Sequence, residues 1–176
     1  MKEMDDRTWA SRFRDELTGN ILSFWTTRAV DRQNGGFFGM IDGDLRVDNE
    51  VPRTSVVNTR ILWTISAACR LISSQYRETA DWAYDYIRLK FWDSEKDGLY
   101  WTVDCRGNPL STRKQIYAQA FGIYALAEYY RVTGIAESLA LARCLIARIE
   151  EHSYDPIFKA IWKHATVNGG RSRTCG

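Results

Sequence analysis

Polar side chains are concentrated at the start of a strongly apolar stretch in the middle of the chain. Between residues 111 and 130, apolar side chains cover most of the circumference of the helix that the sequence predicts, which is typical of a helix buried inside a larger protein. The polar side chains lie in its first turns, namely Arg113, Lys114, Gln115, Tyr117 and Gln119. A cation, a phenol and amides at one end of a buried helix indicate a polar site at the mouth of a helical core.

Residues 54–72 have the same organisation. This stretch is mostly apolar from Val56 to Ile72, and its polar side chains near the start include Asn58, Thr59 and Arg60. The chain therefore contains two candidate buried helices, each with polar groups toward its beginning.

Apolar residues at helical spacing predict five long helices, at about residues 5–28, 54–72, 73–91, 112–131 and 135–151. The first, third and fifth are amphipathic, whereas the second and fourth are apolar nearly all round. In the first helix the residues expected to face the core are Trp9, Phe13, Leu17, Ile21 and Phe24. Ser111 or Thr112 is expected to cap the start of the fourth helix, and Gly134 to end it.

Loops that combine glycine with aromatic residues separate these helices. Residues 34–42 and 92–104 each carry a glycine, then aromatic residues, then an apolar–Asp pair, and a weaker copy begins at residue 153. We expect short strands at 36–41 and 98–103. A repeat of this length indicates stacked units that share a core. Alternating buried and amphipathic helices predict an all-α fold, an incomplete α/α toroid with about half of a ring of stacked helical hairpins.

The composition of the chain limits the kinds of partner that the protein is expected to bind. The formal net charge is only +2, so nothing in the charge favours nucleic acid or an anionic membrane. No apolar run approaches the length of a membrane span. The N-terminus lacks the apolar core of a signal peptide, so we expect a cytoplasmic protein. The four cysteines and two histidines lack the spacing of a metal site, and no metal is expected.

Several strings of residues resemble the N-acylglucosamine 2-epimerase superfamily, and within it most closely the cellobiose 2-epimerases. They include Asn-Thr-Arg-Ile-Leu-Trp at 58–63, Gly-Leu-Tyr-Trp-Thr-Val-Asp at 98–104 and Arg-Lys-Gln-Ile-Tyr-Ala-Gln-Ala-Phe at 113–121. The resemblance covers residues 8–159. It implies an (α/α)6 barrel with a central sugar site, so that residues 1–159 would form the N-terminal part of such a barrel.

The resemblance also implies a reaction that needs no cofactor: epimerisation at C2 of the reducing-end glucose of a β-1,4-linked disaccharide. After ring opening, one histidine removes the C2 proton, a cis-enediolate forms, and a second histidine returns a proton to the opposite face. Imidazole suits this role because its pKa lies near neutral pH. Arg60 matches the family's active-site arginine, which stabilises the enediolate and orients the open-chain sugar, and Tyr117 matches an active-site tyrosine.

Arg60 and Tyr117 also have purely structural interpretations. Arg60 is alternatively an ion-paired arginine at a helix start, and Tyr117 a core tyrosine whose hydroxyl is hydrogen-bonded. Lys114 and Gln119 are expected to be structural, and Trp63, Trp92 and Trp101 to pack in the core or in loops.

The functional alternatives are an N-acylglucosamine 2-epimerase, an aldose–ketose isomerase, or a non-catalytic helical glycan-binding or scaffold fragment. The family's catalytic histidines have no counterpart among the 176 residues, since neither His152 nor His164 matches them. We therefore expect the polypeptide to be inactive alone, and to self-associate through the exposed flanks of its two inner helices.

Residues 160–176 do not match the family pattern and show neither helical nor strand periodicity. For one choice of codons, inserting a single G before them converts the segment to Gly-Tyr-Met-Glu-Ala-Cys-Asp-Arg-Glu-Trp-Arg-Pro-Ile-Glu-Asp-Met-Arg. That string resembles the family's continuation. The hypothesis is a frameshift at this point, and the alternative is a naturally divergent terminus.

Overall fold

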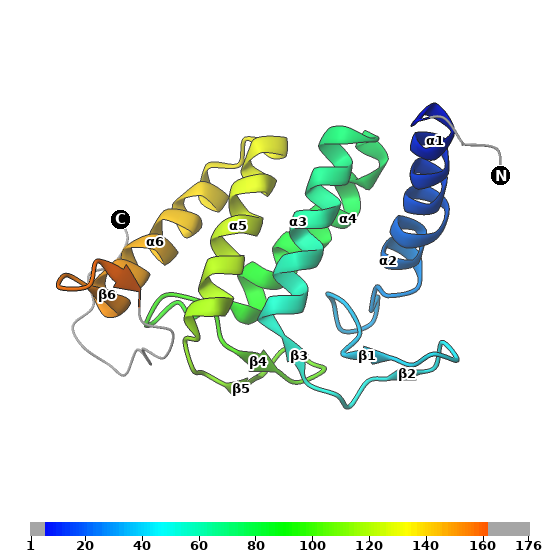
Figure 1. The fold of residues 1–176 in the computed structure, drawn as a ribbon. Helices are drawn as coiled ribbons and strands as arrows, with labels where there is room; N and C mark the ends of the chain where they lie inside the picture. Colours follow the sequence, from blue (N-terminus) through cyan, green and yellow to red (C-terminus); the bar gives the residue numbers. More distant parts are fainter. Residues whose placement is uncertain (1–5, 162–176) are drawn as a thin grey trace.

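The helices that the sequence predicts are present in the computed structural model, which describes residues 6–161 (Figure 1). Within these residues the five predicted helices are found, two of them with π or 3₁₀ turns at an end or inside. In chain order they are α1 (Asp6–Glu16), η1 (Leu17–Leu22) and α2 (Ser23–Thr27) as one continuous segment, α3 (Ser55–Leu71), η2 (Ser74–Tyr76) with α4 (Arg77–Tyr86) and η3 (Ile87–Phe91), α5 (Ile116–Thr133), and α6 (Ala136–Ser153).

The ends of the two inner helices show which capping predictions hold. Thr54 caps α3, because its hydroxyl accepts a hydrogen bond from the Val57 N–H at 3.3 Å. Gly134 ends α5 with a left-handed φ of 71°, as expected. The predicted start of α5 at Ser111 or Thr112 is wrong: Ser111 is held in a β-strand, and the helix begins only after Gln115, whose backbone is extended.

Short antiparallel strands connect the helices at the end where α3 and α5 begin (Figure 1). The pairs are β1 (Met40–Ile41) with β2 (Val47–Asp48), a three-stranded sheet in the order β3 (Arg53–Thr54), β4 (Thr102–Val103) and β5 (Pro109–Ser111), and β6 (Tyr154–Asp155) with β7 (Ala160–Ile161). The strands expected at 36–41 and 98–103 are thus formed only in their last two residues. The central sheet joins the segment before α3 to the segment before α5.

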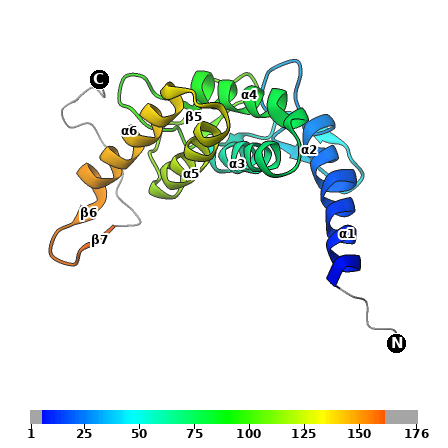
Figure 2. The ribbon, with the colours of Figure 1, turned by 90° about the horizontal axis from the view of Figure 1, so that it is seen from above.

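The helices form an arc, with α3 and α5 side by side on its inner side and α4 on its outer side (Figure 2). The core between these layers is fully buried and includes Leu62, Ile65, Ile87, Leu126 and Leu145. The observed arrangement is a sector of an α/α toroid, as the alternation of buried and amphipathic helices predicts. No helix within residues 6–161 has both the length and the apolar character that crossing a bilayer requires.

The first helix differs from expectation in its packing. Its apolar face was expected to lie against the core, but no residue of α1 is buried, and Trp9 and Phe13 are 43% and 68% exposed. Farther along the same face, Leu17 and Phe24 are partly buried and pack against the core as expected, and Leu22 is the first fully buried residue. The physical reason is visible in Figure 2, where α1 projects from one end of the arc instead of lying over another helix.

The predicted boundary at residue 160 falls at the last described strand. Ala160 and Ile161 pair with Asp155 and Tyr154, so the expectation that this segment lacks strand structure is wrong for its first two residues. The remainder of the segment for which we expect a frameshift lies outside the described residues.

Candidate functional site

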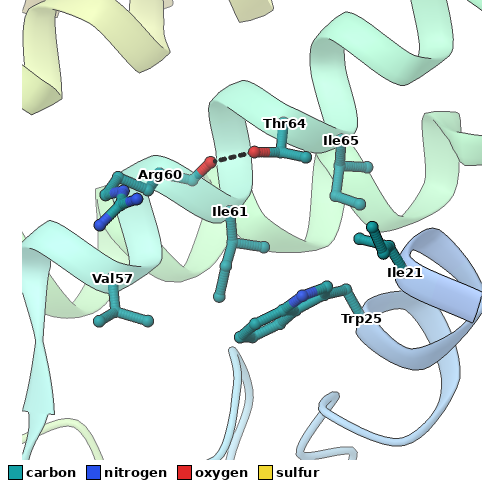
Figure 3. Close-up of a pocket in the computed structure, with 7 residues that line it drawn as sticks. All are labelled: Ile21, Trp25, Val57, Arg60, Ile61, Thr64 and Ile65. Carbon is teal, nitrogen blue, oxygen red and sulfur yellow. Dashed lines mark hydrogen bonds between the residues drawn. The ribbon is translucent and has the colours of Figure 1, made fainter. Parts of the chain in front are cut away.

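A hollow of about 390 Å³ lies beside the inner helix α3 (Figure 3). Val57, Arg60, Ile61 and Thr64 line it because residues three and four apart share one face of a helix. The segment from η1 to α2 closes the other side. The lining residues are Ile21, Trp25, Val57, Arg60, Ile61, Thr64 and Ile65.

Arg60 supplies the only charged group among these lining residues. Its side chain is exposed, and its guanidinium carbon lies 5.8 Å from the centroid of the Phe121 ring on α5. Within residues 6–161 no carboxylate forms an ion pair with Arg60. The cation is therefore free to interact with a polar or anionic group of a ligand.

Tyr117 lies on the same inner surface, one turn before Phe121. Its side chain is 58% exposed, so it is not a core residue. The Tyr117 and Phe121 rings meet edge to face, with centroids 4.9 Å apart. The structure thus brings Arg60 and Tyr117 into contact with one aromatic ring, although they come from different helices.

Two further aromatic residues extend this surface along the inner helices. Trp63 of α3 stacks on Tyr124 of α5, with ring centroids 4.6 Å apart and planes inclined by 14°. Phe121 and Tyr124 were not identified as site residues from the sequence, and Trp63 was assigned to packing. The spacing of residues 117, 121 and 124, which places them on one helix face, is the signal that could have identified the two on α5.

Lys114 and Gln119 do not contribute to the inner surface, because both are buried. The ammonium of Lys114 lies 2.8 Å from the carboxylate of Asp93. Gln119 accepts a hydrogen bond from the Leu99 N–H at 2.7 Å and donates one to the Leu99 carbonyl at 2.9 Å. They hold the loop before β4 against the start of α5 and are structural, as expected.

An equivalent interaction holds the start of α3, and the sequence analysis did not identify it. Arg53 is 1% exposed and forms an ion pair with Asp31. Its guanidinium also donates to the Gly35 carbonyl at 2.5 Å and to the Tyr86 hydroxyl at 3.1 Å. Asp31–Arg53 and Asp93–Lys114 are hereafter the two buried ion pairs.

Both carboxylates of the buried ion pairs remain acidic. Burial by itself would raise the pKa of Asp31 and of Asp93. Hydrogen bonds outweigh burial: Asp31 accepts them from Asn34 and Arg53, and Asp93 from Lys114 and backbone N–H groups. The pKa of each carboxyl is therefore lower than its ordinary value.

The two loops that contain these aspartates are copies of one structure. Asp31, Asp93 and Asp155 recur every 62 residues, as do Gly36 and Gly98. The Asp31 N–H donates to the Gly36 carbonyl at 3.0 Å, and the Asp93 N–H to the Gly98 carbonyl at 2.9 Å. The repeat seen in the sequence is therefore real, and its conserved geometry gives both inner helices the same start.

A sector of an α/α toroid, with a cation and aromatic rings on its inner surface, is the class of protein that the fold and site define. The family model for N-acylglucosamine 2-epimerase (GlcNAc 2-epimerase) matches residues 36–172. The chain belongs to this family.

Individual relatives agree with the family assignment. The chain is 44% identical over 151 residues to the cellobiose 2-epimerase of Bacteroides fragilis, an alignment that covers 85% of this chain and 38% of that enzyme. The solved cellobiose 2-epimerase of Bacillus thermoamylovorans superposes with a TM-score of 0.85 at 40% identity, covering 88% of this chain and 40% of that one. The cellobiose 2-epimerase of Spirochaeta thermophila gives a TM-score of 0.83 at 32% identity. The chain therefore spans about 40% of the length of these relatives.

Proposed function

We propose that this chain forms one part of the sugar site of a cellobiose 2-epimerase, in which Arg60 and Tyr117 contact the substrate. The observation that supports this most strongly is the exposed guanidinium of Arg60, which has no ion-pair partner within residues 6–161 and lies on the inner surface of a sector that is 44% identical to such an enzyme. In the proposed reaction a C2 proton is removed from the open-chain sugar and replaced on the opposite face. Arg60 stabilises the oxyanion of the enediolate that forms in between.

Tyr117 has a binding role in this proposal. Its edge contact with Phe121 fixes the ring, and Tyr117 remains 58% exposed. A phenol hydroxyl can donate a hydrogen bond to a sugar hydroxyl or accept one from it. Such a contact exists before and after proton transfer, so we expect it to affect KM more than kcat.

We further propose that the 176-residue polypeptide does not epimerise cellobiose alone. Two groups must transfer protons on opposite faces of C2, and loss of each typically costs about 10²–10⁴-fold in rate. The residues on the inner surface of α3 and α5 include no histidine. Arg60 can stabilise an enediolate but is not a base that could generate one.

A chimera tests the proposed function. The segment of the Bacteroides fragilis enzyme that matches this chain is replaced by residues 8–159, and the product is assayed on cellobiose, N-acetylglucosamine and mannose. We expect conversion of cellobiose to glucosyl-mannose, reduced about 10²–10³-fold in kcat by Arg60→Ala. Arg46→Ala, which changes an exposed arginine in the loop between β1 and β2, is the matched control. A folded chimera that acts only on N-acetylglucosamine or only on mannose would replace this proposal with a GlcNAc 2-epimerase or an aldose–ketose isomerase.

A second candidate function is glycan binding without turnover. The stacked Trp63 and Tyr124 rings and the exposed Tyr117 favour it, because aromatic faces are a common platform for sugar rings. In that case the chain binds cellobiose, and Arg60→Ala leaves the affinity largely unchanged. Titration of the purified chain with cellobiose separates the two functions.

A further inference from the structure

Phe121 lies between the two residues that we propose to contact the substrate. The guanidinium carbon of Arg60 is positioned over the Phe121 ring, 5.8 Å from the ring centroid. The Tyr117 and Phe121 rings meet edge to face, with centroids 4.9 Å apart. Arg60 belongs to α3, whereas Tyr117 and Phe121 belong to α5. A single aromatic ring therefore connects two side chains that come from different helices.

The hydrophobic core does not explain why an aromatic residue occupies position 121. The Phe121 side chain is only partly buried. Within residues 6–161, the partly buried hydrophobic residues that pack against the core include Ile123 of the same helix, but not Phe121. The ring instead contacts three residues of the inner surface, namely Arg60, Tyr117 and Tyr124. This distribution of contacts indicates a role in the site.

Two features of α5 hold the Phe121 ring in place. Its centroid lies 6.4 Å from that of Tyr124, with the planes inclined by 82°, and Tyr124 stacks on Trp63, which packs against the core. The second feature is Gly122, where a Cβ atom would lie only 2.7 Å from the side chains of two core leucines. This close approach limits rotation of α5 about its axis, and it therefore sets the direction in which residue 121 points.

An arginine that has no ion pair needs another means of orientation. The exposed side chain of Arg60 is long, and ordering such a side chain on ligand binding costs conformational entropy. An aromatic face attracts a guanidinium through the quadrupole of the ring. A carboxylate would also occupy the N–H donors of the cation, whereas a ring leaves them available to a ligand. Phe121 can thus orient Arg60 and preserve its charge and its hydrogen-bonding capacity.

We propose that Phe121 is a positioning residue, which holds Arg60 and Tyr117 in the arrangement that receives the open-chain sugar. This inference rests on the proposed function, because it takes Arg60 as the group that stabilises the enediolate. Phe121 acts on the transition state through Arg60 and on substrate binding through Tyr117. Its loss should therefore lower kcat through the first contact and raise KM through the second.

Double-mutant cycles in the chimera test the two contacts separately. Phe121→Leu keeps an apolar side chain but removes the ring, and it should lower kcat about 10-fold and raise KM about 3- to 10-fold. In an Arg60→Met background the same substitution should leave kcat nearly unchanged, because the group that it positions is already absent. In a Tyr117→Phe background, which lacks the hydroxyl, it should leave KM nearly unchanged.

Two further variants separate positioning from packing. Phe121→Tyr retains the ring and should recover most of the kcat that Phe121→Leu loses. Ile123→Val is the matched control, because Ile123 lies on the same helix and packs against the core. It should leave kcat and KM close to those of the parent chimera. Circular dichroism verifies that each variant keeps its helices.

A second measurement reports the Arg60 contact without relying on activity. In the 176-residue chain with isotope-labelled arginine, the side-chain N–H signal of Arg60 is identified in NMR spectra by its loss in Arg60→Met. A proton over an aromatic face is shifted upfield by the ring current. Phe121→Leu should therefore move this signal downfield, and Ile123→Val should not.

Each outcome bears on a defined claim. The inference is overturned if Phe121→Leu leaves kcat and KM of an active chimera unchanged, or lowers kcat equally with and without the Arg60 guanidinium. The proposed function survives both results. A folded chimera that is inactive on all three sugars counts against the proposed function, and the Arg60 signal then decides the inference. A signal that moves in Phe121→Leu supports the contact, and one that stays in place overturns it.

Discussion

Arg53 and Arg60 lie seven residues apart but have opposite surroundings. Arg53 is buried and held by Asp31, Gly35 and Tyr86, whereas Arg60 is exposed and its guanidinium lies over the face of Phe121. A guanidinium bound on several sides holds a structure together, and one directed toward open space is available to a ligand. The same residue type thus has a structural role just before α3 and a proposed functional role seven residues further along.

Substitution of the two arginines is expected to separate these roles. Arg53→Met should lower the free energy of unfolding by about 3–5 kcal/mol, since it leaves the Asp31 carboxylate buried without its partner. Arg60→Met should change it by less than about 0.5 kcal/mol, as is usual for exposed positions. Urea unfolding of both variants measures the difference. An equally large loss for Arg60→Met would identify Arg60 as a structural residue.

At the scale of elements, the two buried ion pairs determine where the inner helices begin. Asp31 and Asp93 belong to loops that precede α3 and α5, and each reaches the cation located just before the helix. Strand β4 pairs with β3, so the two helix starts are also linked to each other. The relative position of Arg60 and Tyr117 depends on this arrangement.

Replacing Lys114 by an uncharged residue is expected to remove the ion pair that holds the start of α5. Lys114→Met should lower the free energy of unfolding by about 3–5 kcal/mol, because Asp93 then stays buried without its partner. Arg46→Met is the control: the Arg46–Asp44 pair is 77% and 71% exposed, and such pairs contribute about 0–1 kcal/mol. Equal effects of the two substitutions in urea unfolding would contradict a structural role for the Asp93–Lys114 pair.

The same carboxylates predict how stability depends on pH. The pKa of Asp31 and of Asp93 is lower in the folded chain than its ordinary value of 3.8, so near and below pH 4 the unfolded state binds more protons. The contribution of the two carboxylates to the free energy of unfolding is complete above about pH 4, and it is lost as the pH falls further. Asp93→Asn should therefore destabilise the chain at pH 7, and its deficit relative to wild type should shrink toward pH 2. Urea midpoints across this range provide the measurement, and a constant deficit would refute the assignment.

The sequence predicted elements better than contacts. Five helices and the inner and outer rings follow from helical periodicity, which local side-chain spacing determines. The pairing of residues 53–54 with 102–103 could not be foreseen, because two-residue strands have almost no pattern. Of the site, Arg60 and Tyr117 came from motif resemblance, and their shared contact with Phe121 required the fold. The Asp31–Arg53 pair was missed, although the 62-residue recurrence of aspartate pointed to it.

At the scale of the whole molecule, the arc has an open inner surface. Val57 and Tyr124, on the inner sides of α3 and α5, are 43% and 46% exposed. Apolar area left in contact with water favours association. We therefore propose that the isolated chain self-associates through its inner helices when no partner is present.

A hydrophobic dye reports on this surface. The wild-type chain should increase the dye's fluorescence and show a mass that rises with concentration in light scattering. Joint replacement of Val57 and Tyr124 by serine should reduce both signals, whereas Leu89→Ser on the outer side should leave them nearly unchanged. A chain that stays monomeric and does not increase the dye's fluorescence would argue against self-association.

The 62-residue recurrence also has a consequence for the order of folding. Asp31 and Arg53 are 22 residues apart, and Asp93 and Lys114 are 21 apart, so each buried ion pair closes over a short length of chain. Local contacts form quickly, and stacked repeats add to neighbours already in place. During synthesis, the first pair can close once Arg53 has left the ribosome, well before Lys114 is made. Translation then delivers a folded α3 as the surface on which α5 docks, and the arc grows one sector at a time from its N-terminal end.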